Sequence, residues 1–266
     1  MNIVMTIVLA VVGAIVYLFL NVVTRRMVAG VRSREDYDED VDGKMTDAEK
    51  KAAEEAKVIE QEKKKIGFKD VQKEYGARFY IVATLGAGLG GLAGFFFGLS
   101  VEAFIFFILF AVLTVIAFID MDTMEIPPVL NLIILVLGII SIWASPEITF
   151  KERIIGFFCI SGFMFLMDLI FTLAAGVNAF GGGDMKLMAA AGLLLGWKGI
   201  LTAFLVGIFV GAIIGIALMA RKKKGGREHM PFGPSLCVGI VVASLIGGQF
   251  IDWYLGMAKS MMHSTY

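Results

Sequence analysis

The chain has 266 residues, of which 58% are hydrophobic, and its mean hydropathy is +0.81. A soluble domain is about 45–50% apolar, so this composition indicates an integral membrane protein. The formal net charge is zero, with 24 basic and 24 acidic residues, which excludes a generally basic nucleic-acid-binding protein. The two Cys and two His exclude a disulfide framework, and because both Cys lie in apolar stretches we predict no metal site.

Apolar runs that suit a membrane-crossing helix recur along the chain. We expect an all-α integral membrane protein with about eight transmembrane helices. The first run lacks the preceding basic residues of a signal peptide and is interpreted as an anchor. The expected helices cover residues 3–23, 79–98, 102–120, 129–145, 154–176, 185–197, 199–219 and 235–256.

Basic residues predict the orientation, because Lys and Arg accumulate in cytoplasmic loops. An N-terminus outside the cell leaves only Lys151, Arg153, Lys198 and Lys259 away from the cytoplasm. We therefore divide the chain into a first transmembrane helix (1–29), a charged cytoplasmic region (30–76) and a membrane-embedded domain (77–266). Within the charged region, Thr46-Asp47-Ala48-Glu49 is a capping-box pattern that predicts a solvated helix to Ile66. A spacer is favoured for this region, and a docking arm is the alternative.

Two carboxylates lie at the ends of predicted spans, where charge is costly: about 2.5–3.5 kcal/mol for an Asp at the membrane centre. Asp120 ends the third span and Asp184 begins the sixth. The predicted topology puts both at the cytoplasmic face, where they could meet. Two Asp side chains in one site cannot both ionise cheaply, so the pair would hold one proton, as peptide hydrolysis by an aspartic peptidase requires.

Three glycines, Gly181, Gly182 and Gly183, precede Asp184. They remove every Cβ, so the backbone can adopt positive φ and can approach a bound peptide closely. Unwound backbone at membrane depth is tolerated where it lines a cavity or is packed in protein.

Several segments resemble motifs of the bacterial type IV prepilin peptidases, which are GxGD-type membrane aspartic peptidases. They are residues 20–26 (LNVVTRR), 119–127 (IDMDTMEIP), 181–187 (GGGDMKL) and 230–234 (MPFGP). The resemblance implies that Asp120 and Asp184 are the catalytic pair and that Gly181 and Gly183 are the signature glycines. We expect Gly182, Lys186, Pro231, Phe232 and Gly233 to shape the site or bind substrate.

The resemblance also implies an inner-membrane enzyme whose site faces the cytoplasm. Its partners would be the lipid bilayer and type IV prepilin-like or pseudopilin precursors, which it would cut after a short basic leader. Cleavage itself would need no cofactor. Members often also N-methylate the product with S-adenosylmethionine, an activity associated with a cytoplasmic region that often carries paired cysteines. Residues 24–78 contain no cysteine, which counts against methyl transfer here.

Other polar residues leave alternatives open. Asp168, in the middle of a predicted span, is interpreted as a carboxyl that ties helices together, although a functional role is the default for such a group. Asp122 would point away from Asp120 on a continuing helix, so a solvated loop carboxylate is favoured.

A transporter in which Asp120, Asp168 and Asp184 form a proton or cation path is the second hypothesis for the function of the protein. A presenilin-like intramembrane peptidase, which shares GxGD, is the third, but the residues around Asp120 and the PFGP segment fit it less well.

Overall fold

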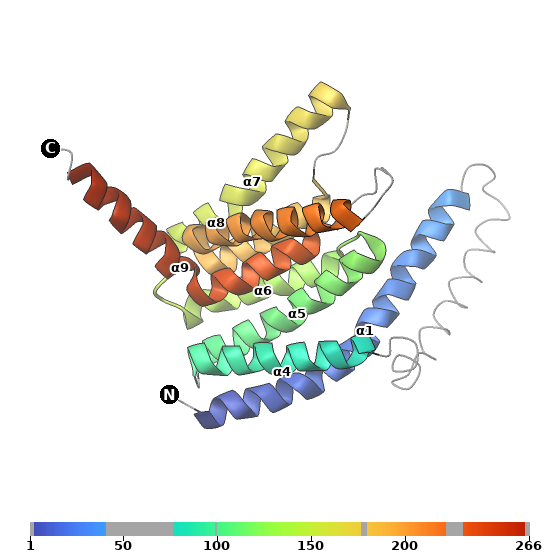
Figure 1. The fold of residues 1–266 in the computed structure, drawn as a ribbon, viewed down its shortest axis with the longest axis horizontal. Coiled ribbons are helices and arrows are strands. Elements are labelled where there is room, and N and C mark those ends of the chain that lie inside the picture. The colour runs from blue at the N-terminus through green and yellow to red at the C-terminus, as the bar shows by residue number, and fades with distance from the viewer. Residues whose placement is uncertain (1–2, 41–76, 99, 177–179, 222–230, 264–266) are drawn as a thin grey trace. The chain divides into compact units, whose positions relative to one another are not determined.

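The computed structural model describes residues 3–40, 77–98, 100–176, 180–221 and 231–263, and every regular element in these ranges is an α-helix. The chain forms two compact units, Met1–Leu99 and Ser100–Tyr266. The first contains α1 (Ile3–Asp40) and α4 (Ala77–Phe97). The second contains the remaining helices (Figure 1): α5 (Val101–Thr123), α6 (Pro128–Ala144), α7 (Phe150–Ala175), α8 (Gly182–Arg221) and α9 (Gly233–His263).

In the first unit, α1 and α4 pack against each other through small residues. A Cβ added to Gly13 would collide with the carbonyl oxygen of Gly86, and one added to Gly94 would lie 2.9 Å from the Cα of Thr6. The two helices are therefore antiparallel and approach backbone to backbone. Small residues at such positions are typical of helix pairs in membranes, where close van der Waals packing replaces the hydrophobic effect.

In the second unit, α5 forms much of the core. Its buried positions recur on all sides of the helix and include Phe110, Leu113, Ile116 and Ile119. Ser100 caps the start of α5, because its hydroxyl accepts the Ala103 N–H at 3.2 Å. Met124, with a φ of 55°, ends the helix in the left-handed conformation. The chain then enters α6 through Pro127 and Pro128, which suit the start of a helix because the backbone N–H that proline lacks would have no intrahelical partner there.

Helix α8 contains a reversal of direction at Gly196. This residue has φ 69° and ψ 177°, which lie outside the helical region. Before it, Gly183 lies against Ile126 and Gly192 lies against Gly156; after it, Gly207 and Gly211 lie against Leu236 and Phe232 at the start of α9. Phe180, which precedes α8, lies near Phe232, with ring centroids 6.3 Å apart. The start of α8 and the part of α8 around Gly211 therefore lie at the same end of the unit. Only glycine adopts this backbone conformation readily.

Arg153, on the first turn of α7, is fully buried and ties three helices together. Its guanidinium donates to the carbonyl oxygens of Ser141 and Ser145 at the end of α6, at 3.0 and 2.8 Å, and to the Ser141 hydroxyl at 2.6 Å. It also donates to the carbonyl oxygens of Leu193 and Leu194, at 3.2 and 3.1 Å, shortly before Gly196. A cation suits these positions because the last carbonyls of a helix lack intrahelical donors and carry partial negative charge.

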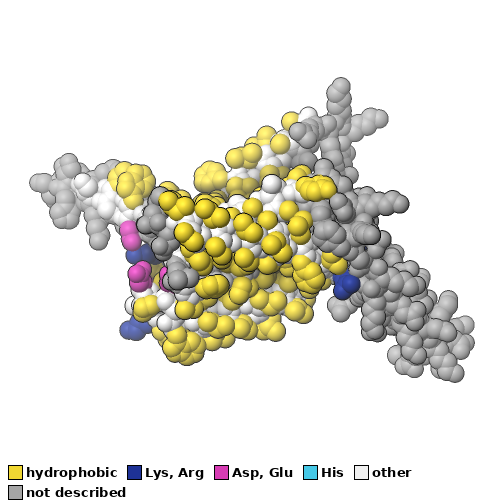
Figure 2. Space-filling model, turned by 90° about the horizontal axis from the view of Figure 1, so that it is seen from below, with side chains coloured by type: hydrophobic (Ala, Val, Ile, Leu, Met, Phe, Trp, Pro, Cys, Tyr) yellow, Lys and Arg dark blue, Asp and Glu magenta, His cyan; other side chains and the backbone are white. Residues whose placement is uncertain are grey.

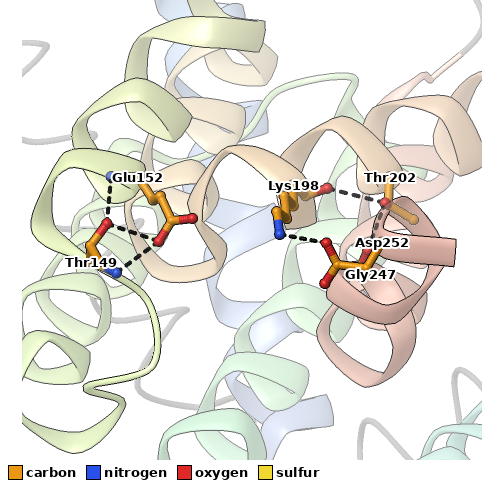
Figure 3. Close-up of polar contacts among 6 residues, drawn as sticks. All are labelled: Thr149, Glu152, Lys198, Thr202, Gly247 and Asp252. Carbon is orange, nitrogen blue, oxygen red and sulfur yellow. Dashed lines mark hydrogen bonds and ion pairs between the residues drawn. The ribbon is translucent and has the colours of Figure 1, made fainter. Parts of the chain in front are cut away.

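The same end of the second unit carries further polar contacts, shown in Figure 3. Thr149 and Glu152 form a capping box at the start of α7. Lys198 forms an ion pair with Asp252 at 2.5 Å, which joins α8 to α9. Thr202 donates to the carbonyl oxygens of Lys198 and Gly247, at 3.1 and 3.2 Å.

The predicted count of eight transmembrane helices is not confirmed. Among the described residues, six helices are long and apolar enough to cross a membrane, and α6 is a shorter apolar helix of 17 residues. At 1.5 Å per residue α6 is about 26 Å long, less than the roughly 30 Å of a hydrocarbon core. The predicted spans 185–197 and 199–219 both lie in α8, on either side of Gly196.

Residues 30–40 of the predicted charged region continue α1 as a helix, and the predicted helix from Thr46 to Ile66 lies outside the described residues.

Hydrophobic side chains cover most of the described surface visible in Figure 2. Many large ones are exposed, such as Phe165 at 61% and Phe209 at 69%. An apolar surface of this extent fits contact with lipid acyl chains, since soluble monomers rarely expose large apolar patches.

Candidate active site

Asp120 lies on the last turn of α5 and is 5% exposed. Its backbone carbonyl accepts the Met124 N–H at 2.8 Å, which closes the helix. Its side chain reaches across to the start of α9, where the Gly233 N–H donates to Asp120 Oδ2 at 3.0 Å. The Asp120 carboxylate thus meets the N-terminal end of α9, where free backbone donors and the helix dipole favour negative charge.

Gly233 permits this contact because it has no side chain. A Cβ at this position would lie 2.7 Å from Asp120 Oδ2 and 2.8 Å from Asp120 Cγ. The neighbouring Phe232 is half-buried and packs against Gly211 of α8, where an added Cβ would lie 3.0 Å from the Phe232 ring. Pro231 is also half-buried. The Pro231-Phe232-Gly233 segment predicted from sequence therefore brings α9 directly onto Asp120.

Asp184 lies on the first turn of α8, and the residue before it, Gly183, packs against Ile126, six residues after Asp120. A Cβ on Gly181 would lie 3.3 Å from Asp184 Oδ2, so the carboxylate rests against the Gly181 backbone. The two aspartates, 64 positions apart in the sequence, are therefore brought to one end of the second unit by α5 and α8.

The glycine run does not use its freedom to adopt positive φ. Among the described glycines, positive φ occurs at Gly98, Gly176 and Gly196, while Gly182 and Gly183 begin α8 as helical residues. Close packing explains Gly183 instead, because a Cβ there would lie 2.9 Å from the Cβ of Ile126. No atom lies within 4 Å of a Cβ built on Gly182.

Asn131 was not predicted from sequence, but it contacts the same segment. This α6 residue is 5% exposed and its Nδ2 donates to the Gly183 carbonyl oxygen at 3.1 Å. Within the described part of the chain, two buried side-chain oxygens lack a hydrogen-bond partner, and they are Asn131 Oδ1 and Asp184 Oδ1. The signal that could have found Asn131 is its place on the buried stripe of α6, which contains Leu130, Asn131, Ile134, Leu137, Gly138 and Ser141.

The remaining polar residues of interest lie outside the contacts among Asp120, Asn131, Gly183 and Gly233. Lys186 is exposed on the first turn of α8. Asp168 of α7 accepts the Phe180 N–H at 3.1 Å, which joins α7 to the segment that precedes α8. Cys237, a buried residue of α9, lies within electrostatic range of both aspartates. In the described ranges, no group of three or more His, Cys, Asp or Glu side chains could hold a metal ion.

The helices and the paired aspartates define a multi-pass helical membrane protein with two carboxylates at one end of its second unit. The model of the type IV leader peptidase family matches residues 107–216, a range that contains both aspartates. No solved structure matches the chain significantly.

Three similar curated proteins, each named a prepilin leader peptidase/N-methyltransferase, show the extent of the likeness. The one from Bacillus subtilis (strain 168) is 31% identical over 172 residues, 65% of this chain and 67% of that protein. The one from Legionella pneumophila is 29% identical over 68% of this chain and 63% of its own length. The one from Burkholderia pseudomallei (strain 1026b) is 32% identical over 66% of this chain and 57% of its own length.

The chain belongs to the type IV leader peptidase family. The matched region spans 57% to 67% of the length of these three relatives. Membership of a peptidase family favours an enzyme over the transporter interpretation, and it is this family, rather than a presenilin-like one, that matches.

Proposed function

We propose that the chain is a membrane aspartic endopeptidase that removes the basic leader peptide from type IV prepilin-like or pseudopilin precursors. One observation carries the proposal: Asp120 on the last turn of α5 and Asp184 on the first turn of α8 lie at the same end of the second unit, where Gly183 packs against Ile126, six residues after Asp120. Family membership supports the same reaction class.

Peptide hydrolysis by such a pair needs one ionised and one protonated carboxyl. The ionised group takes a proton from water as the water oxygen bonds to the scissile carbonyl carbon. The protonated group polarises the carbonyl oxygen. The carbon–nitrogen bond then breaks, and the leaving amine receives a proton from the pair. Water supplies the atoms added to both products, and no covalent enzyme intermediate forms.

Asp120 and Gly233 contribute to this chemistry through geometry. The Gly233 N–H holds Asp120 Oδ2 at 3.0 Å, so the carboxylate has a fixed orientation before substrate arrives. A group oriented in advance contributes more to catalysis than a mobile one, because misplacement by about 1 Å can cost about 100-fold in rate. We propose that Gly181, Gly182, Lys186, Pro231 and Phe232 shape the surrounding site.

The proposed substrate enters from the bilayer, with its apolar N-terminal helix in the lipid and its basic leader in the cytoplasm. The cut then falls at the inner face of the cytoplasmic membrane. Cleavage of precursors whose leader lysines are neutralised tests the role of leader charge, and unchanged rates would argue against electrostatic recognition.

The relatives are named as N-methyltransferases as well as peptidases, and a separate assay decides methyl transfer for this chain. S-adenosylmethionine would serve only that reaction. Residues 24–78, which lack cysteine, are the region where the paired cysteines would be expected. The described residues bring no cysteine pair together, since Cys159 is exposed on α7 and Cys237 is buried in α9. Transfer of a labelled methyl group to the cleaved product would establish the second activity.

The decisive experiment for peptide cleavage compares Asp120→Asn and Asp184→Asn with the wild type, using a pilin precursor in proteoliposomes. Each substitution keeps the volume of the side chain and removes its acid–base function, so we expect each to reduce the rate by about 100- to 10,000-fold. Asp122→Asn is the matched control, because Asp122 is the same residue type on the same helix end, and we expect cleavage at the wild-type rate. Wild-type turnover in either test variant would contradict the proposed pair.

A further inference from the structure

The amide side chain of Asn131 holds the backbone immediately before Asp184. Its Nδ2 donates to the Gly183 carbonyl oxygen at 3.1 Å, a contact between residues 52 positions apart. Asn131 lies on the first turn of α6 and is 95% buried. A buried amide of this kind has no solvent to replace its partner, so the hydrogen bond fixes the two helix starts relative to each other.

Gly183 is held from a second side by Ile126. The Cα of Gly183 faces the Ile126 side chain so closely that an added Cβ would lie 2.9 Å from Ile126 Cβ. Ile126 lies in the connection from α5 into α6, and Asn131 lies on the turn of α6 that directly follows this connection. The preceding residue, Gly182, has open space around it and gives no such restraint. The position of the Asp184 backbone therefore depends on the α5–α6 connection.

Asn131 and Asp184 also share an unusual feature. In the part of the chain that the structure describes, Asn131 Oδ1 and Asp184 Oδ1 are the buried side-chain oxygens with no hydrogen-bond partner. Buried acceptors are normally paired, and an unpaired one in a folded protein is a sign of strain or of a catalytic role. Here the two unpaired oxygens belong to side chains joined through one residue, Gly183.

We infer that Asn131 is a positioning residue. Its Nδ2 fixes the position of Asp184 through Gly183, and its Oδ1 remains available as a hydrogen-bond acceptor. The role in catalysis rests on the proposed function. Asn131 does not take part in bond making, so its loss lowers the turnover number by misplacing Asp184, while the affinity for the precursor is preserved. A residue with a purely space-filling role would not have this effect.

Two substitutions separate the hydrogen bond from volume and from charge. Asn131→Leu has nearly the same volume and no polar atom, so we expect kcat to fall about 10- to 100-fold at every pH, with KM within about twofold of the wild type. Asn131→Asp has the same shape. Its protonated carboxyl can donate to the Gly183 carbonyl oxygen, whereas the ionised form cannot. The ratio of its kcat to that of the wild type should therefore be highest at low pH and fall as the pH rises.

Thr202→Val is the matched control. Thr202 is also buried and makes a comparable side-chain bond to a backbone carbonyl, that of Gly247 at 3.2 Å (Figure 3). It lies near the other end of the second unit, beside the Lys198–Asp252 pair. We expect its kcat to stay within about twofold of the wild type, because a lost hydrogen bond there does not move Asp184.

A measurement that does not depend on turnover tests the link between Asn131 and Asp184 directly. The melting temperatures of Asn131→Leu, Asp184→Asn and the double variant should be non-additive, whereas Thr202→Val and Asp184→Asn should add, because residues in one network couple and distant ones do not. Additive melting temperatures for the first pair would overturn the inference even if no precursor were cleaved.

Three kinetic results would also overturn it while leaving the proposed function intact. They are wild-type kcat in Asn131→Leu, an Asn131→Asp profile parallel to the wild type at all pH values, and loss in Asn131→Asp alone, which would indicate a charge effect. A wild-type protein that cuts no precursor would instead refute the proposed function.

Discussion

Replacing Arg153 with methionine should strongly destabilise the second unit. The guanidinium makes six hydrogen bonds, to Ile148, Ser145, Leu193 and Leu194 once each and to Ser141 twice. Methionine fills a similar volume but donates to none of these acceptors. Leu193 and Leu194 lie just before the reversal at Gly196, where the first half of α8 ends. Their backbone carbonyl oxygens therefore depend on Arg153 for a hydrogen-bond donor.

The expected magnitude follows from the buried acceptors. Each acceptor left unpaired costs about 1–3 kcal/mol, and removing one partner of a buried charged network typically costs about 3–5 kcal/mol. A loss of about 4 kcal/mol would lower Tm by about 8–16 °C, taking 2–4 °C per kcal/mol for a chain of this size. Arg153→Lys keeps the charge but not the planar fork of donors, so we expect a smaller decrease.

The assay is thermal unfolding of the purified protein in detergent. Lys151→Met is the control, since Lys151 is exposed on the same turn of α7 and its loss should change stability by no more than about 0.5 kcal/mol. The reasoning would be refuted if Arg153→Met melted within about 2 °C of Lys151→Met, because the buried network would then contribute nothing measurable.

Two glycine substitutions test the other close contacts. Gly233→Ala would place a Cβ 2.7 Å from Asp120 Oδ2, so the rate of precursor cleavage should fall by about 100-fold. Gly162→Ala is the control, because its Cβ would meet no atom within 4 Å, and it should cleave the precursor at the wild-type rate. Equal cleavage rates for the two variants would contradict this account of Asp120. Gly196→Ala must adopt a φ of 69° and would place a Cβ 2.9 Å from Ile148 Cγ2, so unfolding should show a loss of about 1–3 kcal/mol. Gly248→Ala, with open space around its Cβ, is the comparison for stability, and a Gly196→Ala protein as stable as this one would show that the reversal does not need glycine.

The helices of the membrane region could be predicted because each is a long apolar run. The predicted range 102–120 became Val101–Thr123, and 154–176 became Phe150–Ala175. The ends were less certain because caps decide them: the Thr149–Glu152 capping box starts α7 earlier than its apolar pattern does. The reversal in α8 was expected near residue 198, and it occurs at Gly196, since hydropathy does not distinguish this glycine from Gly199.

The aspartates of the candidate site could be predicted because charge at the end of an apolar helix is costly and therefore conspicuous. Asn131 and Arg153 could not be found in the same way. Asn131 is uncharged and contacts a residue 52 positions away, and Arg153 bonds to carbonyls 40 and 41 positions away. The sequence places Arg153 among the basic residues outside the cytoplasm and does not predict its burial. In the structure it is fully buried, because four backbone carbonyls at two helix ends provide its partners.

Asn131 and Arg153 together explain how the short helix α6 can fix the position of Asp184. Near its start, α6 is bound to Gly183 through Asn131; near its end, Ser141 and Ser145 are joined through Arg153 to Leu193 and Leu194. Asn131 and Ser141 are ten residues apart, as are Gly183 and Leu193, and ten residues of helix span about 15 Å. The two helices therefore run in the same direction with matching spacing between their bonds. The first half of α8 cannot slide along α6 without breaking both connections, and Asp184 therefore lies at the start of a segment that is held near both of its ends.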